Sequence, residues 1–136
     1  MNILVIDDDP MVRICMRRWL PEHRLQFAET EHEALSKIRS DRSGIDLVLC
    51  DSLIPPHAPG EIAKKVVSDY PGLPLAVLST NPSWGTPKER NDVRECVREH
   101  DAAYSQSLAQ NVLLTRESIQ NLASQITRES TADDHV

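Results

Sequence analysis

Three short apolar runs, each followed by an aspartate or a serine, constrain the fold of this chain more than any other feature. The runs are residues 2–6 before Asp7 and Asp8, residues 44–50 before Asp51, and residues 73–78 before Ser79. Apolar residues at consecutive positions predict strands that are buried on both faces, as in a parallel sheet. Because ligands bind outside the carboxyl ends of such strands, we expect these polar groups to meet at one functional edge.

Segments with helical spacing of apolar residues separate these runs. Asp9, Thr30 and Thr115 stand where N-cap residues are expected, and Thr30 is followed by the glutamate of a capping box. The predicted strands are 2–6, 24–28, 44–51, 73–78 and 102–104, and the predicted helices are 10–20, 30–43, 61–70, 88–100 and 115–127. This alternation predicts one α/β domain with helices on both faces of a parallel sheet.

The composition of the chain argues against nucleic acids and membranes as partners. The 136 residues carry a net charge of −6, which argues against a nucleic-acid-binding surface, and mild acidity is adequately explained by solubility. No apolar run approaches the roughly 20 residues that cross a bilayer, and no signal peptide precedes the first strand. Cys15, Cys50 and Cys96 lack metal-site spacing, so we expect reduced thiols and a cytoplasmic protein without membrane contact.

Carboxylates that converge at one sheet edge need a counter-charge to ionise together. Mg²⁺ suits such a place because it accepts one or two carboxylates together with a phosphoryl oxygen. A carboxylate beside the metal can act as a nucleophile toward phosphorus, and a nearby hydroxyl can donate to a phosphoryl oxygen. Asp7, Asp8, Asp51 and Ser79 are therefore the candidate residues of a magnesium-dependent phosphoryl site.

Three segments resemble the receiver domain of two-component response regulators. Residues 3–13 (ILVIDDDPMVR) are similar to its opening, and residues 46–55 (DLVLCDSLIP) are similar to its phosphoacceptor strand. Residues 74–80 (PLAVLST) resemble its fourth strand, and Tyr104 fits its aromatic switch position. The resemblance covers residues 1–127 and leaves residues 128–136 as a polar tail.

The resemblance implies a flavodoxin-like fold with strand order 2-1-3-4-5. It implies that Asp51 accepts a phosphoryl group from a histidine kinase or phosphotransferase, and that Ser79 contacts a phosphoryl oxygen. Asp7, Asp8, Asp51 and the carbonyl of Leu53 would bind Mg²⁺. The protein would be a single-domain signalling module and not an enzyme. It would act on a downstream protein target, and its fourth helix, fifth strand and last helix would offer a homodimer surface.

Several positions depart from the family pattern. Ser107 stands where the family has a lysine after the fifth strand, Leu108 replaces the proline that follows, and no lysine occurs after Lys88. Thr80 replaces a smaller residue, so we expect a narrower route to the acceptor. Without the lysine we expect a more negative pocket and weaker coupling between phosphorylation and the fifth strand.

Two other functions stay open at this point. The first is a degenerate receiver that binds proteins without phosphorylation, which the missing lysine favours. The second is a phosphatase of the haloacid-dehalogenase type, which Met11 and the missing lysine disfavour. Two loop residues also have two interpretations. Trp84 either anchors a partner or covers the sheet edge, and His57 either tunes the charge near Asp51 or is a solvated loop residue.

Overall fold

The computed structural model describes residues 1–81, 83–100 and 111–134. Its strands are β1 (Asn2–Ile6), β2 (Arg24–Ala28), β3 (Leu47–Asp51), β4 (Leu75–Ser79) and β5 (Asn111–Leu113). Its helices are α1 (Pro10–Trp19), α2 (Glu31–Ser40), the short 3₁₀ helix η1 (Arg42–Gly44), α3 (Glu61–Asp69), α4 (Pro87–His100) and α6 (Arg116–Asp134).

The five strands form one parallel sheet in the order β2-β1-β3-β4-β5, which confirms the predicted flavodoxin-like topology. Ile6 pairs with Cys50, and Asp51 pairs with Leu78. This register brings the carboxyl ends of β1, β3 and β4 side by side. The residues that follow or close those strands are therefore neighbours at one edge of the sheet.

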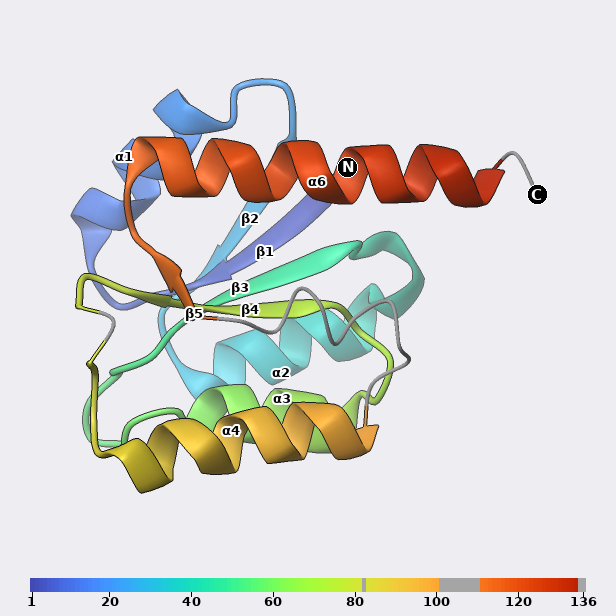
Figure 1. The fold of residues 1–136 in the computed structure, drawn as a ribbon. Helices are drawn as coiled ribbons and strands as arrows, with labels where there is room; N and C mark the ends of the chain where they lie inside the picture. The colour runs from blue at the N-terminus through green and yellow to red at the C-terminus, as the bar shows by residue number, and fades with distance from the viewer. Residues whose placement is uncertain (82, 101–110, 135–136) are drawn as a thin grey trace.

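Helices cover both faces of the sheet (Figure 1). Helices α1 and α6 lie on one face, and α2, α3 and α4 lie on the other. Leu4 and Ile6 of β1 pack in the cluster that includes α2 and α3, whereas Ile3 and Val5 pack in the cluster that includes α1 and α6. Successive side chains of a strand point to opposite faces, so two covered faces require consecutive apolar residues.

The predicted N-caps start their helices. The carboxylate of Asp9 accepts a hydrogen bond from the Met11 amide at 2.9 Å, and Pro10 opens α1. The hydroxyl of Thr30 accepts from the Glu33 amide at 3.1 Å, and that of Thr115 accepts from the Ser118 amide at 3.2 Å. Each cap satisfies an amide that has no partner inside its helix.

The structure places the fifth strand at a different position from the one that the sequence predicts. The fifth strand is Asn111–Leu113 and not residues 102–104, which lie outside the described part of the chain. A three-residue strand is too short to show a period, so periodicity could not locate it. Helix α6 continues to Asp134. The boundary between a domain at 1–127 and a tail at 128–136 stays a prediction.

Among the described helices, none combines the length and the hydrophobicity that a bilayer crossing requires.

Candidate functional site

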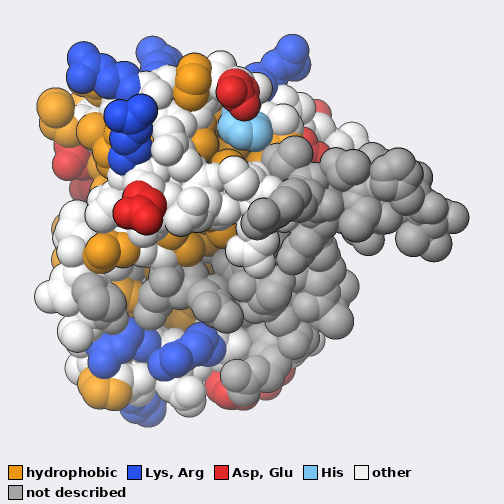
Figure 2. Space-filling model, turned by 45° about the horizontal axis from the view of Figure 1, so that its top comes forward, with side chains coloured by type: hydrophobic (Ala, Val, Ile, Leu, Met, Phe, Trp, Pro, Cys, Tyr) orange, Lys and Arg blue, Asp and Glu red, His pale blue; other side chains and the backbone are white. Residues whose placement is uncertain are grey.

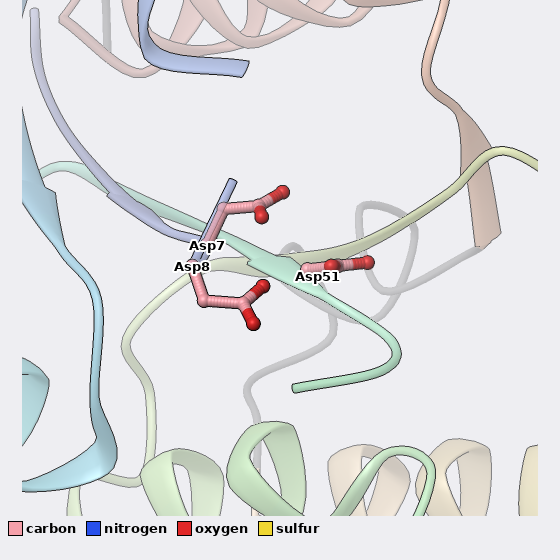
Figure 3. A group of neighbouring side chains, drawn as sticks. All are labelled: Asp7, Asp8 and Asp51. Atoms are coloured by element: carbon pink, nitrogen blue, oxygen red, sulfur yellow. The ribbon is translucent and has the colours of Figure 1, made fainter. Parts of the chain in front are cut away.

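Three carboxylates meet at the carboxyl edge of the sheet (Figure 3). Asp7 and Asp8 directly follow β1, and Asp51 is the last residue of β3. One oxygen from each of the three side chains lies within 4.8 Å of the other two. The structure thus brings together the acidic residues that the sequence analysis had grouped.

Backbone contacts hold the turn that carries Asp7 and Asp8. The Asp7 amide donates to the carbonyl of Ala28 at 3.0 Å, which ties the end of β1 to the end of β2. The Asp7 carboxylate accepts from the Asp9 amide at 2.9 Å, and Asp9 in turn caps α1. The three consecutive aspartates therefore have different roles, because Asp9 is a helix cap and the other two face Asp51.

Burial dominates the electrostatics of the cluster. Asp7 is only 8% exposed, and burial raises its pKa to about 7, with the charges of Asp51 and Asp8 adding to the effect. The hydrogen bond from the Asp9 amide opposes this rise. Burial likewise raises the pKa of Asp51 to about 6, with a contribution from Asp8. Ionising the buried carboxylates of Asp7 and Asp51 together is therefore costly, and a cation nearby would offset that cost.

A cavity of about 330 Å³ lies over this cluster. Its lining includes Asp7, Asp9, Val12, Asp51, Ser52, Leu53, Pro59, Ser79, Thr80, Asn81, Trp84, Gly85 and Leu114. The part of this lining that belongs to the described residues contains no lysine or arginine. The donors are oxygens, which hard divalent cations prefer, so the residues present fit Mg²⁺. The cluster can hold a metal ion.

Ser79 and Leu53 both reach this cavity. Ser79 is 5% exposed, its hydroxyl donates to the carbonyl of Asn81, and it accepts from the Asn81 amide at 3.0 Å. The hydroxyl is therefore held in a local turn. The Leu53 amide lies 3.5 Å from the Asp51 carboxylate, so the loop after β3 folds back on the acidic residue.

Trp84 covers the sheet edge and does not present its ring to solvent. Its side chain is 7% exposed and belongs to the core cluster that contains Val93 of α4. It packs over Gly60, where an added Cβ would lie 3.1 Å from the indole and 2.5 Å from Val93. The structure therefore favours the covering interpretation of Trp84. Gly60 has a φ of +75°, so a side chain there would also be strained.

Of the other predicted positions, the structure describes only His57, which is not part of the acidic cluster. Tyr104, Ser107 and Leu108 fall outside the described residues, so their roles stay predictions. The His57 imidazole lies 3.4 Å from the carboxylate of Glu31 and 3.7 Å from that of Glu61. It joins the first turns of α2 and α3 and is not a solvated loop residue.

Sequence reasoning singled out Trp84 without placing it at the cavity, and it did not find Leu114. Leu114 follows β5, and its amide donates to the Ser79 carbonyl at 2.7 Å. Both residues reach the cavity through tertiary packing of loops. For Trp84 the only local signal was its place in the loop after the predicted fourth strand, since ligand sites form there in open sheets.

The comparisons with known proteins agree with this geometry. No family model matches the chain. A two-component response regulator of Arabidopsis thaliana is 28% identical over 82 residues, which are 59% of this chain and 13% of that protein. Response regulator MprA of Mycolicibacterium vanbaalenii is 36% identical over 84 residues, which are 60% of this chain and 36% of that protein.

A solved structure agrees in fold. The two-component response regulator from Clostridium difficile superposes with a TM-score of 0.72 at 17% identity, covering 94% of this chain and 96% of that one. This chain spans only a minor part of the two sequence relatives. The parallel sheet, the carboxylates at its carboxyl edge and these matches support a receiver domain of the response-regulator type.

Proposed function

We propose that this receiver domain, residues 1–127, accepts a phosphoryl group on Asp51 from a phosphohistidine of a histidine kinase or phosphotransferase. The observation that carries the proposal is the convergence of Asp7, Asp8 and Asp51 within 4.8 Å, beside a cavity that Asp7 and Asp51 line. Receiver domains act in two-component signalling, and we infer a signalling role without enzymatic turnover. Cys15, Cys50 and Cys96 form no disulfide, which fits a reducing compartment such as the cytoplasm.

In the proposed transfer, an Asp51 carboxylate oxygen forms a bond to phosphorus as the bond from phosphorus to the imidazole nitrogen of the donor breaks. The imidazole leaves with the electron pair, and Asp51 becomes an acyl phosphate. The transition state is loose, so the chain mainly positions groups and offsets charge on the equatorial oxygens. Ser79, after leaving its turn with Asn81, would donate its hydroxyl proton to one of these oxygens.

Asp7, Asp8, Asp51 and the backbone carbonyl of Leu53 are the groups that would hold Mg²⁺. The bound ion would neutralise the carboxylates and the phosphoryl oxygens. The raised pKa values of Asp7 and Asp51 support this assignment, because a cation would offset the cost of buried negative charge that a proton removes. The binding of Mg²⁺ should therefore release protons near neutral pH.

Exposed apolar side chains of α1 and of the loop after β3 would offer a surface for the donor protein. Met11 and Ile14 of α1 are 59% and 47% exposed, and Leu53 is 53% exposed. Val12 of the same helix lines the cavity, and the Leu53 amide lies 3.5 Å from the Asp51 carboxylate. A docked donor would cover these side chains while its histidine faces Asp51. Relay to a downstream protein, and a homodimer through α4, β5 and α6, are further parts of the proposal.

Phosphorylation can be tested with a small-molecule donor such as acetyl phosphate in the presence of Mg²⁺. We expect the intact mass of the protein to rise by one phosphoryl group, and the rise to disappear in Asp51→Asn and in the presence of EDTA. Asp9→Asn is a matched control, because Asp9 caps α1 and its amide form can still accept the cap hydrogen bond. A rise that persists in Asp51→Asn would refute the assignment.

The second candidate is a degenerate receiver that binds its partner without phosphorylation. The absence of any lysine after Lys88 favours it, as does the engagement of the Ser79 hydroxyl with Asn81. Beryllofluoride with Mg²⁺ separates the two candidates. Changes in amide chemical shifts around Asp51 that require Mg²⁺ and vanish in Asp51→Asn support the phosphorylated switch. No change in either protein supports the degenerate module.

A further inference from the structure

A hollow larger than the acidic cavity lies far from the acidic cluster. It has a volume of about 610 Å³ and lies between the C-terminal end of α1, the segment that leads to β2, and one side of α6. Asp9 marks the other end of α1, beside the acidic cluster. A ten-residue helix is about 15 Å long, so the two sites are separate. We propose that this groove binds a small molecule that joins a phosphate to a flat ring, such as a nucleoside monophosphate.

Two guanidinium groups would bind the phosphate of the proposed ligand. Arg18 of α1 and Arg116 of α6 line the groove from opposite sides, and Glu22 is the one acidic residue in the described part of the lining. The chain as a whole carries a net charge of −6, so this concentration of positive charge is local. Figure 2 shows the face crossed by α6, with basic side chains and a histidine beside an acidic one. Guanidinium groups form paired hydrogen bonds with phosphate oxygens.

Apolar groups would contact the flat ring of the proposed ligand. Trp19 is partly buried against the core, and Leu20 and Ala123 form buried parts of the lining. An indole beside an apolar floor can stack on a flat ring. The Gln120 side-chain amide donates to the Trp19 carbonyl at 3.3 Å, which fixes the end of α1 to α6. The backbone at Trp19 is therefore held in place.

The polar groups of the groove suit a neutral ring better than a second anion. The His23 imidazole lies 3.3 Å from the Met1 amine, and burial lowers its pKa. It is therefore a neutral hydrogen-bonding group at pH 7, as are Gln120 and the exposed Ser124. Hydrogen-bonding groups of this kind match the ring nitrogens and ribose hydroxyls of a nucleotide. A volume of several hundred cubic ångströms is also usual for a small-ligand site.

The proposal can be tested by a titration of the full chain with AMP, GMP and UMP, followed by amide chemical shifts. EDTA is present, so that the acidic cluster repels phosphate. We expect saturable shifts confined to residues 18–23 and 116–124 with at least one nucleotide. The corresponding nucleoside and inorganic phosphate should each bind at least about tenfold more weakly, because each supplies half of the contacts.

Three variants control the result. Arg18→Ala and Arg116→Ala change exposed side chains, and each should weaken binding about tenfold. Lys88→Ala removes a basic side chain that is 86% exposed on α4, and it should leave binding unchanged. Absence of saturable shifts with all three nucleotides would overturn the proposal. Binding of phosphate as tight as that of the nucleotide, or equal weakening by Lys88→Ala, would also overturn it.

Discussion

Asp7 gives the acidic cluster a pH dependence with a definite sign. Its pKa is raised to about 7 in the folded protein, so between pH 4 and pH 7 the folded state binds more protons than the unfolded state. Without divalent cations, the free energy of unfolding should therefore fall as the pH rises through this range. Each pKa unit corresponds to about 1.4 kcal/mol, so a loss of a few kcal/mol is expected.

Asp7→Asn isolates this contribution, since the amide oxygen can still accept from the Asp9 amide. Urea unfolding in EDTA at pH 5 and pH 8 should show a smaller pH-dependent loss in the variant, which becomes more stable than the wild type at pH 8. An equal loss in both proteins would show that Asp7 is not the group that titrates.

Gly60 has no side chain, and the side chains of Trp84 and Val93 occupy the space that a Cβ would need beside the cavity. Gly60→Ala places a Cβ 2.5 Å from Val93 and 3.1 Å from the indole, and it also forces alanine to a φ of +75°. We expect a loss of about 2–4 kcal/mol from strain and overpacking together. Gly72→Ala is the matched control, because Gly72 has a φ of +88° with nothing within 4 Å of the added Cβ.

The Gly72 variant should lose only about 1–2 kcal/mol, the cost of the backbone conformation. Chemical denaturation of both variants measures the difference. Equal losses at the two glycines would show that the contact with Trp84 adds nothing.

At the scale of elements, Arg90 ties α4 to the loop that carries Trp84. Its guanidinium donates to the Trp84 carbonyl at 2.6 Å and to the Gly85 carbonyl at 3.2 Å. Arg90→Ala should lower stability by about 1 kcal/mol and increase the exposure of Trp84 to an added quencher. Lys88→Ala removes only an exposed ion pair with Asp92 and should change neither quantity. Unchanged quenching in Arg90→Ala would exclude this role for the arginine.

Elements with strong local signals were predictable. Consecutive apolar residues identified β1, β3 and β4, and the caps at Asp9, Thr30 and Thr115 identified the starts of their helices. Parallel pairing then placed Asp7, Asp8 and Asp51 together. These features depend on the spacing of apolar and capping residues along the chain, which can be read from the sequence.

Features that depend on tertiary contacts were not predictable. β5 has three residues, too few for a period, and its position was predicted wrongly. The burial of Trp84 depends on the missing side chain of Gly60, and the bridge from His57 to Glu31 depends on how α2 and α3 are placed. Ser79 was predicted to lie at the site, but its hydrogen bond to Asn81 depends on the path of the loop.

At the scale of the whole molecule, Mg²⁺ should stabilise the folded domain because only the folded state assembles the three carboxylates. At ten to one hundred times its dissociation constant, the ion should add about 1.4–2.7 kcal/mol, or several degrees in the melting temperature. Thermal unfolding with and without Mg²⁺ measures this gain. Asp8→Ala should remove most of it, and retention of the full gain in Asp8→Ala would locate the ion elsewhere.

The most direct measurement is a crystal structure of the chain grown with Mg²⁺ and beryllofluoride. We expect beryllofluoride on the Asp51 carboxylate, Mg²⁺ within coordination distance of Asp7, Asp8 and the Leu53 carbonyl, and the Ser79 hydroxyl turned from Asn81 toward a fluorine. An unmodified Asp51 in crystals that hold both reagents, or Mg²⁺ bound away from the three aspartates, would contradict the proposed phosphoryl site.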